Sequence, residues 1–332
     1  MARDHGGNID WAMATYGGGD WIDLSTGINR RPWPVSGISD AAWRSLPTHA
    51  AMQRLIGVAA ACYRCDPSRL LAVNGASAAI QMIPRLFPPG RAAVLTPTYN
   101  EHAASLRHAG WPVSEVSGID QMEGFDLAVL VNPNNPDGRE WQAETLATLA
   151  TTVGHLVVDE SFADPRPDLS LIPSLPRNAL VLRSFGKFWG LAGLRLGFVI
   201  AQPDLLARLA EAAGPWAVNG PALDIATAAM ADREWAEDAI GYHCEASLRL
   251  DRFAMKAGWQ VVGGTHLFRL YDVSDAQAAQ TALARHHIWT RRFPYSKSWM
   301  RMGVPGNRQE WDRIAHAFKA VFPTATDSMA RT

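Results

Sequence analysis

Between residues 70 and 201, short runs of β-branched and aliphatic residues alternate with stretches of helical periodicity. The short runs are apolar along their whole length and end in Gly, Pro, Asn or Asp, which is typical of strands buried on both faces. Such an alternation predicts an α/β fold with a mainly parallel sheet and helices on both faces. The predicted strands are 70–75, 91–97, 125–133, 155–161, 179–185 and 195–201, with a weaker one at 111–116.

The pattern changes after about residue 235. A long helical region, roughly 221–257, leads into mixed strands and helices that end with a helix at about 307–321. This mixture predicts a smaller α+β domain. The first 35 or so residues are rich in Gly, Trp and Pro, which favours an extended arm. The predicted division is an arm (1–34), a large domain (35–235), a small domain (236–325) and a tail (326–332).

Composition narrows the class of protein. The chain has 332 residues, 48% of them hydrophobic, and a formal net charge of -1. We therefore expect neither a nucleic-acid partner nor a membrane-surface partner. No apolar run is long enough to cross a bilayer, and the opening residues lack a signal-peptide hydrophobic region. Cys62 and Cys65 form a CxxC without a second pair, so we expect reduced thiols. The Arg285-His286-His287 run lacks a third ligand at useful spacing, so we expect no metal site. Together these features predict a cytoplasmic enzyme.

Polar residues stand where the predicted strands end. Ligands bind at the carboxyl edge of such a sheet, so these residues are the candidates for chemistry. A glycine that opens a helix predicts a phosphate seat, and a buried carboxylate needs a cation or a donor. A lysine buried in an apolar stretch must be paired, deprotonated or covalently used. The candidates are Gly75 with Ala76 and Ser77, Tyr99, the asparagine-rich turn NPNNPDG at 132–138, Asp159, Ser184, Lys187 and Arg195.

One ligand uses this whole set of groups. Pyridoxal phosphate has a phosphate, a flat ring, a phenolic oxygen, a basic ring nitrogen and an aldehyde that a lysine captures as a Schiff base. The ordered set of side chains therefore predicts a pyridoxal 5'-phosphate site.

The motifs SFGKFWGLAGLRLGF, NPNNPDG and VVDESF, in this order, resemble the fold type I pyridoxal-phosphate enzymes of the class I/II aminotransferase superfamily over residues 5–321. The resemblance implies a mainly parallel seven-stranded sheet, a smaller α+β domain and a homodimer. It also implies that Lys187 forms the Schiff base, Asp159 holds the protonated ring nitrogen and Asn135 bonds the phenolic oxygen. By the same resemblance Tyr99 stacks on the ring, and Ser184, Arg195 and the backbone of Ala76 and Ser77 hold the phosphate.

Other motifs resemble one branch of the superfamily more narrowly. HGGN, LSTGINRRPWP and PTYNEHAASL are similar to the threonine-phosphate decarboxylases of cobalamin biosynthesis. This resemblance implies decarboxylation of L-threonine O-3-phosphate to (R)-1-amino-2-propanol O-2-phosphate. The alternative is an aminotransferase of the histidinol-phosphate type, since the catalytic residue types do not separate the two reactions.

Substrate contacts follow from the same resemblance. Arg301, in WMRMGV, matches the arginine that grips the substrate carboxylate, and Asn135 also borders the substrate. His5, Asn8, Asn29 and Arg30 are candidates for a substrate-phosphate site, the alternative being an arm that only packs on a partner subunit.

Three positions depart from the family pattern. Phe162 replaces a tyrosine whose hydroxyl reaches the phenolic oxygen. Gly186 replaces a serine that binds the phosphate. Leu46 replaces a tyrosine that reaches the partner subunit's phosphate, which places that contact in doubt.

Overall fold

The computed structural model describes residues 5–322, which form two compact units. The sheet unit contains residues 32–135 and 139–236, and the C-terminal unit contains residues 5–31, 136–138 and 237–322. The chain passes between the two units after residues 31 and 236, whereas the boundaries predicted from the sequence fall after residues 34 and 235. The predicted tail, 326–332, lies outside the described residues.

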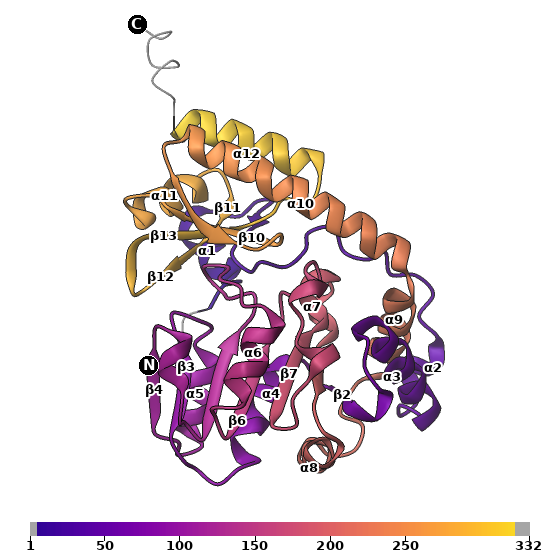
Figure 1. Ribbon diagram of the computed structural model, residues 1–332. Helices are drawn as coiled ribbons and strands as arrows, with labels where there is room; N and C mark the ends of the chain where they lie inside the picture. The colour runs from indigo at the N-terminus through magenta and orange to yellow at the C-terminus, as the bar shows by residue number, and fades with distance from the viewer. Residues whose placement is uncertain (1–4, 323–332) are drawn as a thin grey trace, which may run out of the picture. The chain divides into compact units, whose positions relative to one another are not determined.

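The sheet unit is built on a seven-stranded sheet in the order β2-β8-β7-β6-β5-β3-β4 (Figure 1). Strand β8 runs antiparallel to both of its neighbours, and the other pairings are parallel. The strands are β2 (Leu70–Val73), β3 (Ala92–Leu95), β4 (Val113–Val116), β5 (Leu127–Val131), β6 (His155–Asp159), β7 (Ala179–Ser184) and β8 (Gly197–Ile200).

Helices and short connections cover this sheet. Every residue of β3, β5 and β8 is buried, as expected for strands packed on both faces. The α/β fold class predicted from the sequence is therefore confirmed. The helices are α2 (Asp40–Arg44), α3 (His49–Tyr63), α4 (Ala76–Met82), α5 (Glu101–His108), α6 (Ala143–Ala150), α7 (Phe185–Phe188), α8 (Pro203–Ala213) and α9 (Gly220–Ala231).

Strand direction explains why the candidate residues meet. The parallel strands β2, β3, β5, β6 and β7 all end at one edge of the sheet, and Asp159 and Ser184 are the last residues of β6 and β7. Because β8 runs the opposite way, its first residue lies at this same edge, two residues after Arg195. A single edge thus collects side chains from 75 to 195 along the chain.

The C-terminal unit contains a four-stranded antiparallel sheet in the order β12-β13-β10-β9 and a parallel pair, β1 with β11. In Figure 1 the long helix α10 lies beside α12, and Trp311 of α12 donates to the hydroxyl of Tyr242 on α10 at 3.2 Å. The elements are α1 (Ile9–Tyr16), β1 (Ile22–Asp23), α10 (Arg233–Lys256, in this unit from Glu237), β9 (Gln260–Gly264), β10 (Phe268–Asp272), α11 (Ala276–Ala284), β11 (Ile288–Trp289), β12 (Arg291–Phe293), β13 (Ser296–Gly303) and α12 (Arg308–Val321).

One local expectation is wrong. The predicted extended arm contains helix α1, because Ala12 is fully buried and the ring of Trp11 packs 5.6 Å from that of Trp289. Such aromatic packing orders a segment whose glycines alone favour an extended chain. The predicted helical region, roughly 221–257, is confirmed and contains two helices, α9 and α10. They are separated at Asp232, which leaves the helical conformation and whose carboxylate accepts the backbone N–H of Trp235 as a cap for α10.

Candidate active site

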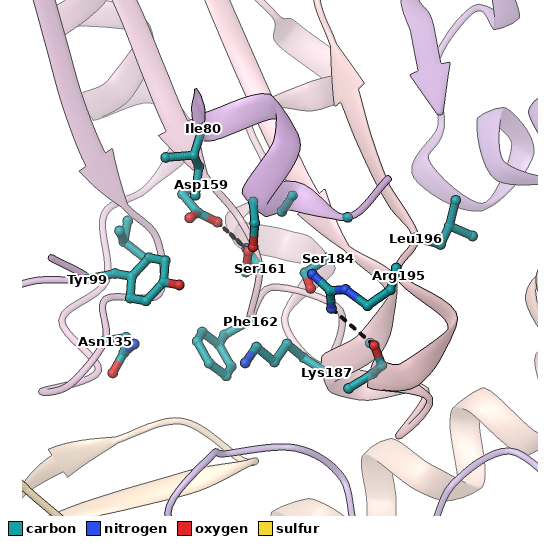
Figure 2. A pocket seen from close by; sticks show the side chains of 16 residues that line it. Ile80, Tyr99, Asn135, Asp159, Ser161, Phe162, Ser184, Lys187, Arg195 and Leu196 are labelled. Carbon is teal, nitrogen blue, oxygen red and sulfur yellow. Dashed lines mark hydrogen bonds between the residues drawn. The ribbon is translucent and has the colours of Figure 1, made fainter. Parts of the chain in front are cut away.

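A pocket of about 680 Å³, its open mouth included, lies in the sheet unit at the edge where the strands end (Figure 2). The structure gathers every cofactor-binding candidate from the sequence into its lining: Ala76, Ser77, Tyr99, Asn135, Asp159, Ser184, Lys187 and Arg195.

Lys187 lies on the single turn α7, directly after β7. Its Nζ is 5.5 Å from the centroid of the Phe162 ring, a cation–π distance. Gly186 allows this tight turn: a Cβ there would lie 2.7 Å from Cα of Ala192. The departure from serine at position 186 therefore has a steric reason, and so the lysine turn packs directly on the segment that leads to Arg195.

Asp159 is almost fully buried, and three hydrogen bonds hold its carboxylate. His102 Nε2 lies 2.9 Å from Oδ2, while the hydroxyl and the backbone N–H of Ser161 reach Oδ1 at 2.5 and 2.9 Å. Burial by itself raises the pKa of Asp159, but the hydrogen bonds from His102 and Ser161 outweigh it and lower that pKa below its usual value. The carboxylate is therefore ionised at neutral pH.

Gly75, Ser184 and Arg195 line another part of the pocket. Gly75 has φ +78°, and a Cβ there would lie 2.9 Å from Nη2 of Arg195, so the guanidinium lies against the glycine. Arg195 Nη1 donates to the carbonyl oxygen of Ala192 at 3.1 Å, which fixes the orientation of the guanidinium plane. Backbone N–H groups after Gly75 and a planar cation form a suitable seat for a phosphate.

The three asparagines of the turn at 132–138 have different surroundings. Asn132 bonds the backbone of Trp141 in both directions, and Asn134 accepts from Thr98 at 2.7 Å. These two amides hold the turn together, while Asn135 lines the pocket with Tyr99.

These groups fit pyridoxal phosphate. The pocket offers an amine for its aldehyde, an ionised carboxylate for its ring nitrogen, an amide for its phenolic oxygen and a cationic seat for its phosphate. Glycine at 75 lets the Arg195 guanidinium lie against the backbone of the phosphate seat, because a Cβ there would lie 2.9 Å from Arg195 Nη2. Among residues 5–322 no cluster of three or more His, Cys, Asp or Glu is arranged to hold a metal ion.

The predicted substrate residues His5, Asn29, Arg30 and Arg301 all belong to the C-terminal unit. His5 and Asn8 line a second pocket with Ser25, Thr290 and Arg291. Their roles in binding substrate remain predictions.

Three of these candidates already have well-defined partners. The Arg30 guanidinium pairs with Glu310, its Nε at 2.9 and 3.0 Å from the two carboxylate oxygens. Asn29 is buried, and its side-chain oxygen accepts the backbone N–H of Arg31 at 2.7 Å. Arg301 is also buried and donates to the carbonyl oxygen of Ser25 at 2.6 Å.

Arg291 is a residue that the sequence reasoning missed. It is the direct cross-strand partner of Arg301 on β12 and β13. Burial, followed by the charge of Arg291, lowers the pKa of Arg301 to about 9. Like charges directly opposite each other destabilise a sheet. In the sequence, Arg291 stands in the RRF run shortly before WMRMGV, which contains Arg301. That these two arginines face each other follows only from the strand register.

A buried ion network lies just behind the cofactor-binding edge, and the sequence did not indicate it. Arg183 bridges Glu160 at 3.0 Å and Asp164 at 2.9 Å, and stacks over the Tyr63 ring. Burial raises the pKa of Glu160 and of Asp164, and Arg183 opposes that rise. The network connects the ends of β6 and β7, which carry Asp159 and Ser184.

Comparison with known proteins identifies the class. The family model for aminotransferases of class I and II matches residues 48–318, and the chain belongs to this family. The predictions of the superfamily, of a pyridoxal-phosphate enzyme and of pyridoxal 5'-phosphate as its cofactor are therefore confirmed.

Individual relatives are more specific. A threonine-phosphate decarboxylase of Sinorhizobium sp is 42% identical over 323 residues, covering 94% of this chain and 96% of the relative. A threonine-phosphate decarboxylase of Pseudomonas aeruginosa is 42% identical over 324 residues with the same coverage. The crystal structure of histidinol-phosphate aminotransferase from Sinorhizobium meliloti, in complex with pyridoxal-5'-phosphate, superposes with a TM-score of 0.83 at 20% identity and covers 94% of each chain. At that identity the likeness shows the fold.

Proposed function

We propose that this protein is a pyridoxal-phosphate-dependent decarboxylase that converts L-threonine O-3-phosphate to (R)-1-amino-2-propanol O-2-phosphate in cobalamin biosynthesis. The proposal is supported by the threonine-phosphate decarboxylases that are 42% identical over 94% of the chain. A substrate of this kind carries two acidic groups, a carboxylate and a phosphate.

The structural observation that carries the proposal is the cross-strand pair Arg291 and Arg301. Arg301 is 5% exposed, and a buried cation beside another cation is stabilised when an anion binds to both. His5 and Arg291 line the same pocket, which adds donors for a second acidic group. We assign the substrate carboxylate to Arg301 and its phosphate to the pocket that His5 and Arg291 line.

We assign roles to five residues of the sheet-unit pocket. Bound pyridoxal phosphate supplies an electron sink next to the Cα of the substrate. Asp159 would keep the ring nitrogen protonated, Asn135 would bond the phenolic oxygen, and Ser184 and Arg195 would hold the phosphate of the cofactor. Lys187 would hold the cofactor through its amine, and the same amine would be placed to return a proton to the Cα of the substrate.

The choice between decarboxylation and transamination depends on the pose of the substrate. Decarboxylation would require the protein to hold the substrate so that its carboxylate, and not its Cα hydrogen, is the group released. Two anchored acidic groups restrict rotation about Cα more than one does. The alternative, an aminotransferase for a phosphorylated substrate, would use the same residues with the substrate held so that the Cα hydrogen is released.

A direct assay tests the proposal. Purified protein with pyridoxal phosphate is incubated with L-threonine O-3-phosphate, and carbon dioxide and aminopropanol phosphate are measured. A parallel sample contains histidinol phosphate and 2-oxoglutarate, and glutamate is measured. We expect carbon dioxide without glutamate; glutamate without carbon dioxide would overturn the decarboxylase proposal and leave the cofactor site standing.

We also propose that the enzyme is a cytoplasmic homodimer. No helix in residues 5–322 is long and apolar enough to cross a membrane. Trp43, Leu46 and Trp216 of the sheet unit are 66%, 64% and 57% exposed, and large exposed apolar side chains favour a protein interface. Light scattering in solution tests the dimer, and a monomeric mass at micromolar concentration would contradict it.

A further inference from the structure

The two carboxylate oxygens of Asp159 have different numbers of hydrogen-bond partners. Both donors of Ser161, its hydroxyl at 2.5 Å and its backbone N–H at 2.9 Å, bond Oδ1 (Figure 2). Oδ2 interacts with His102 Nε2 at 2.9 Å. An ionised carboxylate has about four acceptor positions, roughly two on each oxygen. The protein thus fills Oδ1 and leaves one position on Oδ2.

We propose that Ser161 is a positioning residue for Asp159: it occupies Oδ1, so that the ring N–H of pyridoxal phosphate bonds Oδ2. This inference rests on the cofactor and holds for a decarboxylase and for an aminotransferase alike. It goes beyond the proposed reaction because it assigns to Ser161, which lines the pocket beside Asp159, a role that acts through Asp159.

The hydroxyl of Ser161 can be tested separately from its backbone N–H. The backbone N–H of residue 161 bonds Asp159 through an Asx turn, which any residue except proline can make. A hydroxyl at the same position adds a second donor to Oδ1, and charge-assisted bonds to a buried carboxylate are strong. Alanine at 161 therefore removes one bond and keeps the turn.

The surrounding backbone does not depend on that hydroxyl. Glu160 accepts the backbone N–H of Leu171 and the hydroxyl of Ser170, both at 2.7 Å, and pairs with Arg183. Successive strand residues point to opposite faces, so Glu160 anchors the loop from the side opposite to Asp159. We therefore expect Ser161→Ala to fold, with its effect confined to the carboxylate.

Ser170 offers a matched control. Its hydroxyl also donates to a buried carboxylate in this loop, at 2.7 Å, but the acceptor is Glu160 and Ser170 is not part of the pocket lining. Ser170→Ala removes the same chemical group from the neighbouring acid. Ser161→Thr restores a hydroxyl at the proposed position.

The test measures cofactor binding without substrate. Apo-protein is titrated with pyridoxal phosphate, and the visible absorbance of the lysine-linked cofactor gives the dissociation constant and its pH profile. Loss of one charge-assisted bond should weaken binding about tenfold or more in Ser161→Ala. Ser161→Thr should recover most of the affinity, and Ser170→Ala should bind as the wild type does. Wild-type affinity and pH profile in Ser161→Ala, or equal losses in both alanine variants, would overturn the proposal.

A cofactor analogue separates positioning from direct contact. In an analogue with carbon in place of the ring nitrogen, no ring N–H is present to bond Asp159. If Ser161 acts through Asp159, the ratio of dissociation constants between Ser161→Ala and wild type should fall close to one with this analogue. A ratio that persists would mean that the Ser161 hydroxyl contacts the ligand itself, and the positioning role would be refuted.

Discussion

Arg291 and Arg301 are direct cross-strand partners on β12 and β13, and Arg301 is almost fully buried. Like charges directly opposite each other on a sheet repel. We propose that binding of an anionic substrate offsets this repulsion.

Replacing Arg291 by methionine tests this trade. We expect Arg291→Met to leave the free energy of unfolding unchanged or to raise it by about 0.5 kcal/mol, since a like charge is removed. kcat/KM for L-threonine O-3-phosphate should fall about tenfold or more, because a charge-assisted bond to the substrate is lost. Denaturation curves and steady-state kinetics measure the two quantities. Arg285→Met, at an exposed arginine of the same unit, is the control, and unchanged kcat/KM in Arg291→Met would contradict the assignment.

Lys187 should be indispensable for the covalent state of the cofactor. Lys187→Ala is expected to abolish the visible absorbance of the lysine-linked cofactor together with turnover, because no other pocket residue carries an amine. Absorbance spectra and single-turnover assays check this. Lys297→Ala, at an exposed lysine of β13, should behave as the wild type does. Turnover that survives Lys187→Ala would overturn the central assignment.

Arg183 should contribute to stability more than a similar surface arginine. Arg183→Met leaves Glu160 and Asp164 buried without their cation, which should cost about 3–5 kcal/mol of the free energy of unfolding. Arg166 also pairs with two acids, but its side chain is 32% exposed, so Arg166→Met should cost less than about 1 kcal/mol. Urea denaturation of both variants distinguishes the two cases, and equal losses would show that burial of the network is unimportant.

The Arg183→Met variant should also acquire a pH dependence. Burial raises the pKa of Glu160 and of Asp164, and removal of Arg183 should raise both further. A folded state whose carboxyl pKa values are raised binds more protons than the unfolded state, so its stability falls as pH rises through that range. The stability lost in Arg183→Met should therefore be larger at pH 8 than at pH 5. An equal loss at the two pH values would mean that neither acid becomes protonated.

Gly186 should not accept the serine that relatives carry. A Cβ at 186 would lie 2.7 Å from Cα of Ala192, whereas a Cβ at Gly193 would meet nothing within 4 Å. Gly186→Ser should therefore lower thermal stability and weaken binding of pyridoxal phosphate, although it adds a hydroxyl near the phosphate seat. Gly193→Ser should change neither quantity by much. Tighter cofactor binding in Gly186→Ser would contradict this steric argument.

Much of the fold and of the cofactor site could be predicted from local patterns. Apolar runs punctuated by Gly, Pro and Asn predict buried strands, and the carboxyl ends of parallel strands share one edge. For this reason Asp159, Ser184 and Lys187 could be placed together without coordinates, and all eight cofactor candidates line one pocket. The motif around Lys187 further indicated the family to which the chain belongs.

Contacts between distant parts of the chain depended on the tertiary structure. His102 and Asp159 are 57 residues apart, and Arg291 faces Arg301 only because of the hairpin register. Helix α1 within the predicted arm forms because Trp11 packs on Trp289, 278 positions later in the numbering. Hydrophobic periodicity encodes which face of an element is buried, but strand register and loop closure decide which side chains meet there. The sequence by itself therefore determined the fold class and the chemistry of the cofactor, whereas the tertiary structure decided which donors hold Asp159 and which arginines stand together.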